Sequence, residues 1–372
     1  MRFQLLQDII DFLRHKKKKE RRDIVTEFHK KYVAPHPLNT YKNLIFTSGF
    51  GHSGSGAILD LLCEFDNTTV LGGHDVEGGT QYKNTTPFEF DFIRRYGGIF
   101  CLENICHTSN KTYANNFILN FINLIEYYFQ TNVPIYNDEF LQLSYDFIDK
   151  LTDRKVAVSS PMAGNEAFMY VNAPRADWAN LMSPYLVGGR NNRFKYYVKD
   201  LSVKEYRKLA NEYLQKVFKT IESKENLVLD AGLGDGTADF DKYEDYVGKY
   251  KNITVYRDPR DVYMTGWILG EEWIPRDEEH FVFWYRNSFN NLDKYINSND
   301  SRNITLRFED LVLNYDKSLA QILNFLNIDK SHHIAPKTHF LPEYSAKNIG
   351  LYKNSTHKKA IEYIQEHLKD YC

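Results

Sequence analysis

The sequence predicts an α/β fold with a central, mainly parallel sheet and helices around it. Two segments predict it, because in each a short apolar run of the kind found in buried strands leads straight into a helical pattern. They are residues 44–62 and, about two hundred positions later, residues 253–265. A strand that runs into a helix is the usual connection in parallel sheets, so both segments favour this fold class.

The first segment also has a glycine-rich middle, with four glycines between positions 49 and 56. Glycines let the backbone adopt left-handed angles and approach a ligand, so that successive N–H groups point inward. The helix that follows adds its positive N-terminal end to an anion held there. The segment therefore predicts a phosphate cradle. Its candidate residues are Gly51, His52, Ser53, Gly54, Ser55 and Gly56.

This loop differs from the P-loop of nucleoside triphosphatases, whose pattern is Gly-x-x-x-x-Gly-Lys-Ser/Thr. Counted from Gly51, the second glycine falls at Gly56, but Ala57 and Ile58 occupy the lysine and hydroxyl positions. The loop thus has no lysine for the β- and γ-phosphates and no hydroxyl for Mg²⁺. The sequence argues against a magnesium-dependent nucleoside triphosphatase.

The second segment reads Tyr-Arg-Asp-Pro-Arg-Asp-Val at residues 256–262. Asp258 suits the N-cap of the predicted helix, Pro259 its first position and Asp261 its third position. Arg257 projects from the strand end, and Thr265 lies two helical turns further along.

These two segments, in this order, resemble the sulfotransferases that use 3′-phosphoadenosine-5′-phosphosulfate (PAPS). Residues 306–312, Leu-Arg-Phe-Glu-Asp-Leu-Val, are similar to the family's Arg-Tyr/Phe-Glu-Asp-Leu segment. Residues 347–353, Lys-Asn-Ile-Gly-Leu-Tyr-Lys, are similar to its C-terminal loop, Lys/Arg-x-x-Gly-x-Trp-Lys. The resemblance covers residues 43–78 and 251–370 and is to carbohydrate-type members, with a bacterial source expected.

The resemblance implies a P-loop-NTPase-like three-layer fold, with a central mainly parallel sheet and a largely helical insertion. In the family the glycine-rich loop holds the 5′-phosphosulfate. The 3′-phosphate site falls on Arg257 and Thr265, and the closing loop on Lys347 and Gly350. Most members have Lys or Arg where this chain has His52, whose protonated ring could donate to the leaving phosphate.

The residue that takes the proton from the acceptor stays open among several candidates. Carbohydrate sulfotransferases often carry this base as a Glu after the second strand, a position that matches Glu77, with His74 and Asp75 as rivals. Asp230 ends a predicted strand at 227–231, on the ligand side of the sheet. Any of them must reach the attacking oxygen within hydrogen-bond distance.

The resemblance implies an enzyme of the EC 2.8.2 type. It would move a sulfuryl group from PAPS to a hydroxyl of a glycan or glycolipid by in-line displacement, leaving 3′-phosphoadenosine-5′-phosphate and needing no metal. Two alternatives are a P-loop-type phosphotransferase and a non-catalytic nucleotide-binding relative that has lost the loop cation.

The 372 residues suffice for one large domain with an insertion. We expect an N-terminal helical and basic segment with a linker at 1–42, a sulfotransferase domain at 43–372, and an acceptor-binding insertion at 80–225. Helical patterns within the insertion cover 117–129, 140–151 and 203–221. The net charge of −2 argues against general nucleic-acid binding, and the four cysteines show no disulfide or zinc spacing.

The sequence shows no run near the roughly 18 apolar residues of a membrane span and no signal-peptide pattern. We therefore expect a cytoplasmic protein. An apolar-periodic stretch leads into the basic block at residues 14–22, a combination that can attach peripherally to the anionic inner face of a membrane.

Overall fold

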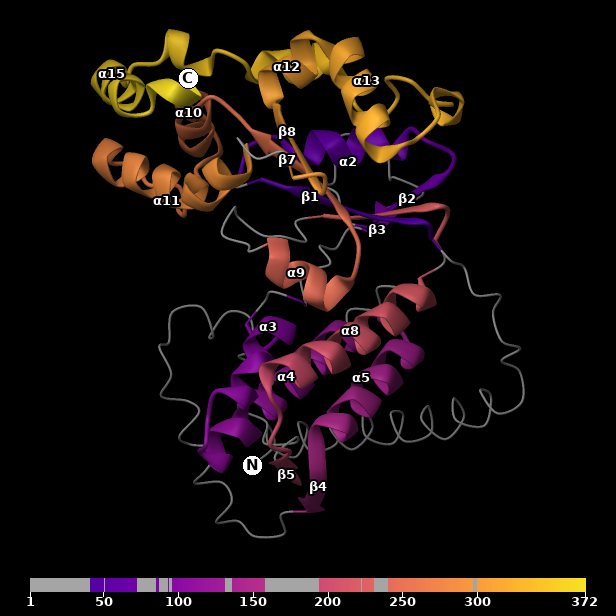
Figure 1. Cartoon of the computed structure of the whole chain (residues 1–372). Helices are drawn as coiled ribbons and strands as arrows, with labels where there is room; N and C mark the ends of the chain where they lie inside the picture. Colours follow the sequence, from indigo (N-terminus) through magenta and orange to yellow (C-terminus); the bar gives the residue numbers. More distant parts are fainter. Residues whose placement is uncertain are drawn as a thin grey trace, which may run out of the picture. The chain divides into compact units, whose positions relative to one another are not determined.

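The computed structural model describes residues 41–49, 51–71, 85–86, 93, 96–130, 136–157, 194–221, 223–230, 240–296 and 300–372. Within them, six strands form one sheet in the order β3-β2-β6-β1-β7-β8 (Figure 1). All neighbouring strands in it pair in parallel. The strands are β1 (Asn43–Ser48), β2 (Thr68–Leu71), β3 (Thr85–Thr86), β6 (Asn226–Leu229), β7 (Lys251–Tyr256) and β8 (Asn303–Arg307). The predicted parallel sheet is confirmed.

Strand β1 lies between β6 and β7, where the strand order changes direction. The chain continues from β1 to β2 on one side, whereas β7 and β8 lie on the other side. In open parallel sheets, ligands bind outside the carboxyl ends of the strands at such a switch point. The glycine-rich loop leaves β1, and the Arg-Asp-Pro-Arg-Asp segment leaves β7, so the two segments begin at the same edge from adjacent strands.

Helices connect the strands and complete the chain. Outside the insertion, those before β8 are α2 (Ser55–Cys63), α9 (Phe240–Val247), α10 (Pro259–Leu269) and α11 (Glu278–Ile296). After β8 come α12 (Phe308–Leu313), α13 (Tyr315–Leu326), α14 (Pro342–Ser345) and α15 (Lys358–His367). Short 3-10 helices are η3 (Lys330–His332), η4 (Ala346–Asn348), η5 (Leu351–Asn354) and η6 (Lys369–Tyr371).

The side chains of β1 alternate between two apolar clusters, because successive side chains of a strand point to opposite faces. Leu44 and Phe46 belong to a cluster with α9 and the insertion helices, whereas Ile45 packs with α2, α12 and α13. Figure 1 shows α2, α12 and α13 on one face of the sheet and α9 on the other. A sheet covered on both faces is the expected three-layer α/β arrangement, which is thereby confirmed.

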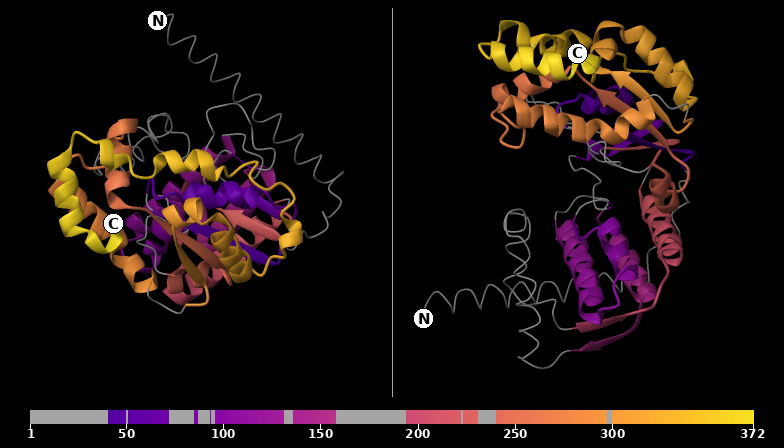
Figure 2. Two further views of the ribbon diagram at one scale, coloured as in Figure 1. Left: turned by 90° about the horizontal axis from the view of Figure 1, so that it is seen from above. Right: turned by 60° about the vertical axis from the view of Figure 1, so that its left-hand side comes forward.

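Between β3 and β6 the described chain is mostly helical. It forms α3 (Ile99–Leu102), η1 (Glu103–Cys106), α4 (Lys111–Gln130), α5 (Asp138–Leu151) and α8 (Val203–Thr220). Strands β4 (Thr152–Ala157) and β5 (Phe194–Val198) form a separate antiparallel pair. Helices α4, α5 and α8 lie side by side, with β4 and β5 at one end (Figures 1 and 2).

The three helices expected in the insertion are confirmed, although α4 is longer than predicted. It begins at Lys111 rather than Phe117, because the Asn110 side chain accepts a hydrogen bond from the Thr112 N–H at 2.9 Å and acts as a cap. The predicted segment at 1–42 lies almost wholly outside the described residues. Its membrane attachment, and the acceptor-binding role of the insertion, stay predictions.

A buried carboxylate, that of Glu103, ties the insertion to α9. It accepts a hydrogen bond from Arg207 Nε at 2.8 Å and another from the Tyr246 hydroxyl, and it lies 3.3 Å from Lys242 Nζ. Burial by itself would raise the pKa of Glu103, but these three partners lower it from 4.5 to about 2. A carboxylate with a lowered pKa stabilises the fold above its ordinary pKa, and that stability disappears as the pH falls toward 2.

We predict that Glu103→Gln lowers the free energy of unfolding at pH 7 by about 1.5–3 kcal/mol, the contribution of hydrogen bonds to a charged group. The difference from wild type should shrink as the pH falls from 4.5 toward 2, because the wild-type carboxylate then becomes protonated. Urea unfolding at several pH values measures both effects. Asp149→Asn, at an exposed position of α5, is the control. A difference that stays constant with pH would show that the Glu103 charge is not responsible.

Candidate functional site

The loop after β1 turns into α2 through two left-handed residues. His52 has a φ of 60° and Gly54 a φ of 95°. A Cβ at Gly54 would lie 2.3 Å from the Phe308 ring, so both the backbone angle and the close contact require glycine there. Within the described residues no side chain caps the start of α2 at Ser55. A turn of this shape at a helix N-terminus is suited to holding an anion, as the sequence predicts.

The Ser53 hydroxyl is the clearest sign of a ligand in this loop. Ser53 is 1% exposed, and its Oγ has no hydrogen-bond partner among the described residues. A Cβ at Gly49 would lie 2.1 Å from that oxygen, so a larger residue at position 49 would clash with the hydroxyl. A buried, unsatisfied hydroxyl costs about 1–3 kcal/mol. Its position beside the helix N-terminus suits a bond donated to a bound anion.

Arg257 joins this loop to the C-terminal part of the chain. It is 4% exposed, and its Nη1 and Nη2 donate to the carbonyl oxygens of His52 (3.1 Å) and Asn348 (2.5 Å). Its Nε has no partner among the described residues, and its guanidinium carbon lies 5.2 Å from the centre of the Phe308 ring. Burial lowers the pKa of Arg257, but Asp261 and nearby carboxylates oppose that shift. An arginine remains charged under such conditions.

The other charged residues of this segment hold the start of α10 in place. Asp258 accepts from the Arg260 backbone N–H at 2.9 Å, as an N-cap does, and also from the Arg260 guanidinium. Glu309 accepts from the Asp258 N–H at 3.0 Å and from Arg307 Nε at 2.9 Å. Arg260 thus stabilises the start of α10. Arg257, in contrast, donates to the loop after β1 and to the C-terminal loop.

Asp261 fixes the C-terminal loop to α10. One of its carboxylate oxygens accepts from the Gly350 N–H at 2.7 Å, and the other accepts from the Tyr352 N–H at 3.3 Å. Burial raises the pKa of Asp261, while the Gly350 N–H and the Arg257 charge act in the opposite direction. Gly350 has a φ of 77°, which lets both N–H groups meet the same carboxylate.

The predicted site residues divide into four groups. Gly51 to Gly56, Arg257 and Gly350 come together, through the Arg257 and Asp261 contacts described above. Thr265 lies on α10 and donates to the Asp261 carbonyl at 2.8 Å, and Lys347 Nζ lies 4.9 Å from the centre of the Tyr344 ring. Asp230 directly follows β6, is 4% exposed and accepts from the Thr47 hydroxyl at 3.1 Å. The base candidates Glu77, His74 and Asp75 lie outside the described residues.

Three site residues were not found from the sequence. Phe308 lies against both Gly54 and Arg257, and Glu271 and Trp273 lie against His52. Phe308 belongs to the motif at residues 306–312, but this motif does not indicate which residues the Phe308 ring contacts. Glu271 and Trp273 stand in a short connection after α10, where no periodic pattern marks them.

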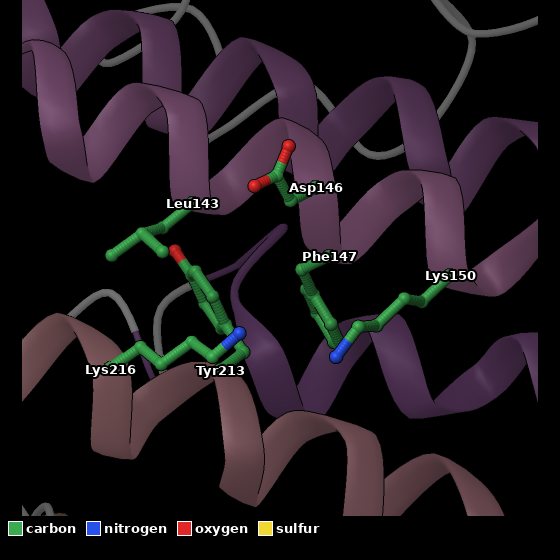
Figure 3. Close-up of a pocket in the computed structure, with 6 residues that line it drawn as sticks. All are labelled: Leu143, Asp146, Phe147, Lys150, Tyr213 and Lys216. Atoms are coloured by element: carbon green, nitrogen blue, oxygen red, sulfur yellow. The ribbon is translucent and has the colours of Figure 1, made fainter.

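A small cavity in the insertion is not part of this site. It lies between α5 and α8 and holds about 10 Å³, the space of about one water molecule (Figure 3). Its lining residues are Leu143, Asp146, Phe147, Lys150, Tyr213 and Lys216. Such a space is too small for a nucleotide or a sugar.

Two further properties concern metals and membranes. Over the described residues, we find no cluster of three or more His, Cys, Asp or Glu side chains that could hold a metal ion. In the same part of the chain, none of the helices is both long and apolar enough to cross a membrane.

Comparison with known proteins gives structural similarities only. No family model matches the sequence. No curated protein matches it either. Similar solved structures include the sulfotransferase domain of the Synechococcus PCC 7002 olefin synthase, with 13% identity over 91% of this chain and 98% of that one and a TM-score of 0.38. The sulfotransferase domain from the curacin biosynthetic pathway has 10% identity over 89% and 98%, with a TM-score of 0.34. Sulfotransferase STF9 from Mycobacterium avium has 10% identity over 96% and 81%, with a TM-score of 0.34.

We predict that Asp261→Ala frees the C-terminal loop without unfolding the sheet. Losing bonds to a charged carboxylate, at about 1.5–3 kcal/mol, should speed hydrogen exchange at the Gly350 amide by about tenfold to a hundredfold. Mass-spectrometric exchange of peptides covering 346–354 measures this change. Glu362→Ala, at an exposed position of α15, is the control. Unchanged exchange at Gly350 in Asp261→Ala would contradict the assigned role.

Proposed function

We propose that this protein is a sulfotransferase that moves a sulfuryl group from PAPS to a hydroxyl of a glycan or glycolipid. The observation that carries the proposal is the pair of buried hydrogen-bond donors at the carboxyl ends of the parallel strands. The Ser53 hydroxyl and Arg257 Nε lie in one loop system, and neither has a partner among the described residues. Phosphate and sulfate oxygens are strong acceptors for such donors.

The residues present fit a nucleotide that carries anionic groups at two positions. The N–H groups of residues 51–56 and the Ser53 hydroxyl suit the 5′-phosphosulfate, and Arg257 with Thr265 suits the 3′-phosphate. Rotation of the Thr265 hydroxyl away from the Asp261 carbonyl would let it donate to that phosphate. Lys347 and Gly350 belong to the loop that Asp261 holds over this region. When bound, the donor supplies an activated sulfuryl group with a phosphate as its leaving group.

In the proposed reaction the chain aligns the reactants and stabilises the charge that develops. A bond forms between the acceptor oxygen and sulfur while the bond from sulfur to the bridging phosphate oxygen breaks, and that oxygen keeps the electron pair. N–H groups at the start of α2 are fixed dipoles that stabilise this charge without reorganising. The acceptor proton passes to a base, for which Glu77, His74 and Asp230 remain the candidates.

The alternatives make different demands on the same loop. A P-loop phosphotransferase needs a lysine and a hydroxyl at the positions of Ala57 and Ile58, and this chain has neither. A non-catalytic relative would bind the nucleotide equally well but would show no turnover with any acceptor. Nucleotide preference tests the first alternative, and turnover tests the second.

We predict that the protein binds 3′-phosphoadenosine-5′-phosphate more tightly than 5′-AMP or Mg²⁺-ATP in calorimetric titrations. Arg257→Ala should weaken binding of the bisphosphate by about a hundredfold, because charge-assisted hydrogen bonds contribute about 1.5–3 kcal/mol. Ser53→Ala should weaken it by about fivefold, because a single neutral hydroxyl contributes about 1 kcal/mol.

Arg286→Ala, at an exposed arginine on α11, is the matched control and should leave binding unchanged. Thermal unfolding of each variant separates lost binding from lost folding, since Arg257 also joins two loops. Equal or tighter binding of Mg²⁺-ATP would contradict the sulfotransferase assignment. With the bisphosphate bound as expected, radiolabelled PAPS and a panel of glycans then test transfer itself.

A further inference from the structure

The connection between α10 and α11 covers the glycine-rich loop with an aromatic ring. The Trp273 and His52 rings are stacked, with centres 5.4 Å apart and planes 16° from parallel. A Cβ at Gly51 would lie 1.8 Å from the Trp273 ring. The close contact therefore depends on glycine at position 51, which gives this residue a role besides backbone freedom.

The same connection brings a carboxylate to the imidazole. Glu271 Oε2 accepts from the Trp273 indole N–H at 2.7 Å, and Glu271 Oε1 lies 3.6 Å from His52 Nε2. The indole thus holds one carboxylate oxygen while the other faces the ring nitrogen. Side chains of Glu271 and His52 are 33% and 23% exposed, so the pair is only partly screened by water.

The charged groups around His52 act in opposite directions. The Glu271 carboxylate favours the protonated ring, because an opposite charge at this range stabilises the charged form. The Arg257 guanidinium opposes it, since it donates to the His52 carbonyl. However, Asp258, Asp261 and Glu309 surround Arg257 and offset its charge. Among these charged groups, Glu271 is the one that faces the ring nitrogen itself.

We propose that Glu271 is a positioning residue that keeps His52 protonated beside the anion-binding loop, with Trp273 holding both. The imidazolium then supplies the cation that the loop lacks, since no lysine or arginine occurs between positions 49 and 58. This inference rests on the proposed function, in which the loop binds a phosphosulfate. Glu271 would thus favour anion binding through His52. Its own negative charge, acting directly, would repel the anion.

Because these two effects change the affinity for PAPS in opposite directions, Glu271→Gln distinguishes them. The amide keeps an oxygen that can accept from Trp273 but removes the charge. If Glu271 acts through His52, the variant should bind PAPS about tenfold more weakly than wild type at pH 7.5 and at least as tightly at pH 5.5, where we expect His52 to be protonated in both. If Glu271 only repels the anion, the variant binds more tightly throughout the range.

The experiment is a calorimetric titration with PAPS, without acceptor, from pH 5.5 to 8. Titration of the ligand itself is common to all proteins and cancels in their differences. Glu272→Gln, which removes the exposed neighbouring carboxylate, is the matched control and should follow wild type. In a His52→Lys background the charge is permanent, so Glu271→Gln should no longer weaken binding at pH 7.5. Tighter or unchanged binding by Glu271→Gln at every pH would overturn the inference.

A second measurement separates this inference from the proposed function. In ligand-free protein with labelled histidine, the His52 ring signal should titrate about one pH unit lower in Glu271→Gln than in wild type. An unchanged midpoint overturns the role of Glu271 even if PAPS binds. If the midpoint shifts but the protein does not bind PAPS, the sulfotransferase assignment is contradicted. The effect of Glu271 on the protonation of His52 would still be supported.

Discussion

The buried guanidinium of Arg257 is the interaction on which the site depends. It donates to carbonyl oxygens of His52 and Asn348, so one side chain joins the loop after β1 to the loop after α14. Burying such a charge is costly unless neighbouring groups compensate it. Here two carbonyl dipoles, the face of the Phe308 ring and nearby carboxylates do so. The arrangement of these two loops therefore solvates this one cation.

The carboxylates near Arg257 compensate its charge while leaving it able to bind an anion. A bidentate pair with Asp or Glu would use the guanidinium fork that a phosphate needs. Instead, Asp261 accepts from the N–H groups of Gly350 and Tyr352, and Glu309 accepts from the N–H of Asp258. The negative charges thus fix backbone segments and act on Arg257 through space. In the proposed site, the unpartnered Nε of Arg257 can then donate to a dianionic ligand without breaking an ion pair.

The parts of the site that the sequence predicted are those defined by local spacing. Asp258 caps α10 because an aspartate followed by proline suits a helix start, and the glycines after β1 mark a turn whatever surrounds them. The contacts of Gly54 with Phe308 and of Gly51 with Trp273 join residues far apart in the sequence, and no local pattern encodes them. The same holds for Glu103. No sequence motif surrounds it, so nothing nearby in the sequence indicates its partners on α8 and α9.

The two cations assigned to the site differ in a way that suits their tasks. Arg257 carries a permanent charge, which suits the proposed binding of a phosphate that stays attached to the nucleotide throughout the reaction. The charge of His52 instead depends on protonation of its ring, which the proposed role of Glu271 is to maintain. As charge builds on the leaving phosphate, that oxygen competes better with Glu271 for the imidazolium. In the proposed reaction, an interaction that strengthens in this way raises the rate of transfer in addition to the affinity for the donor.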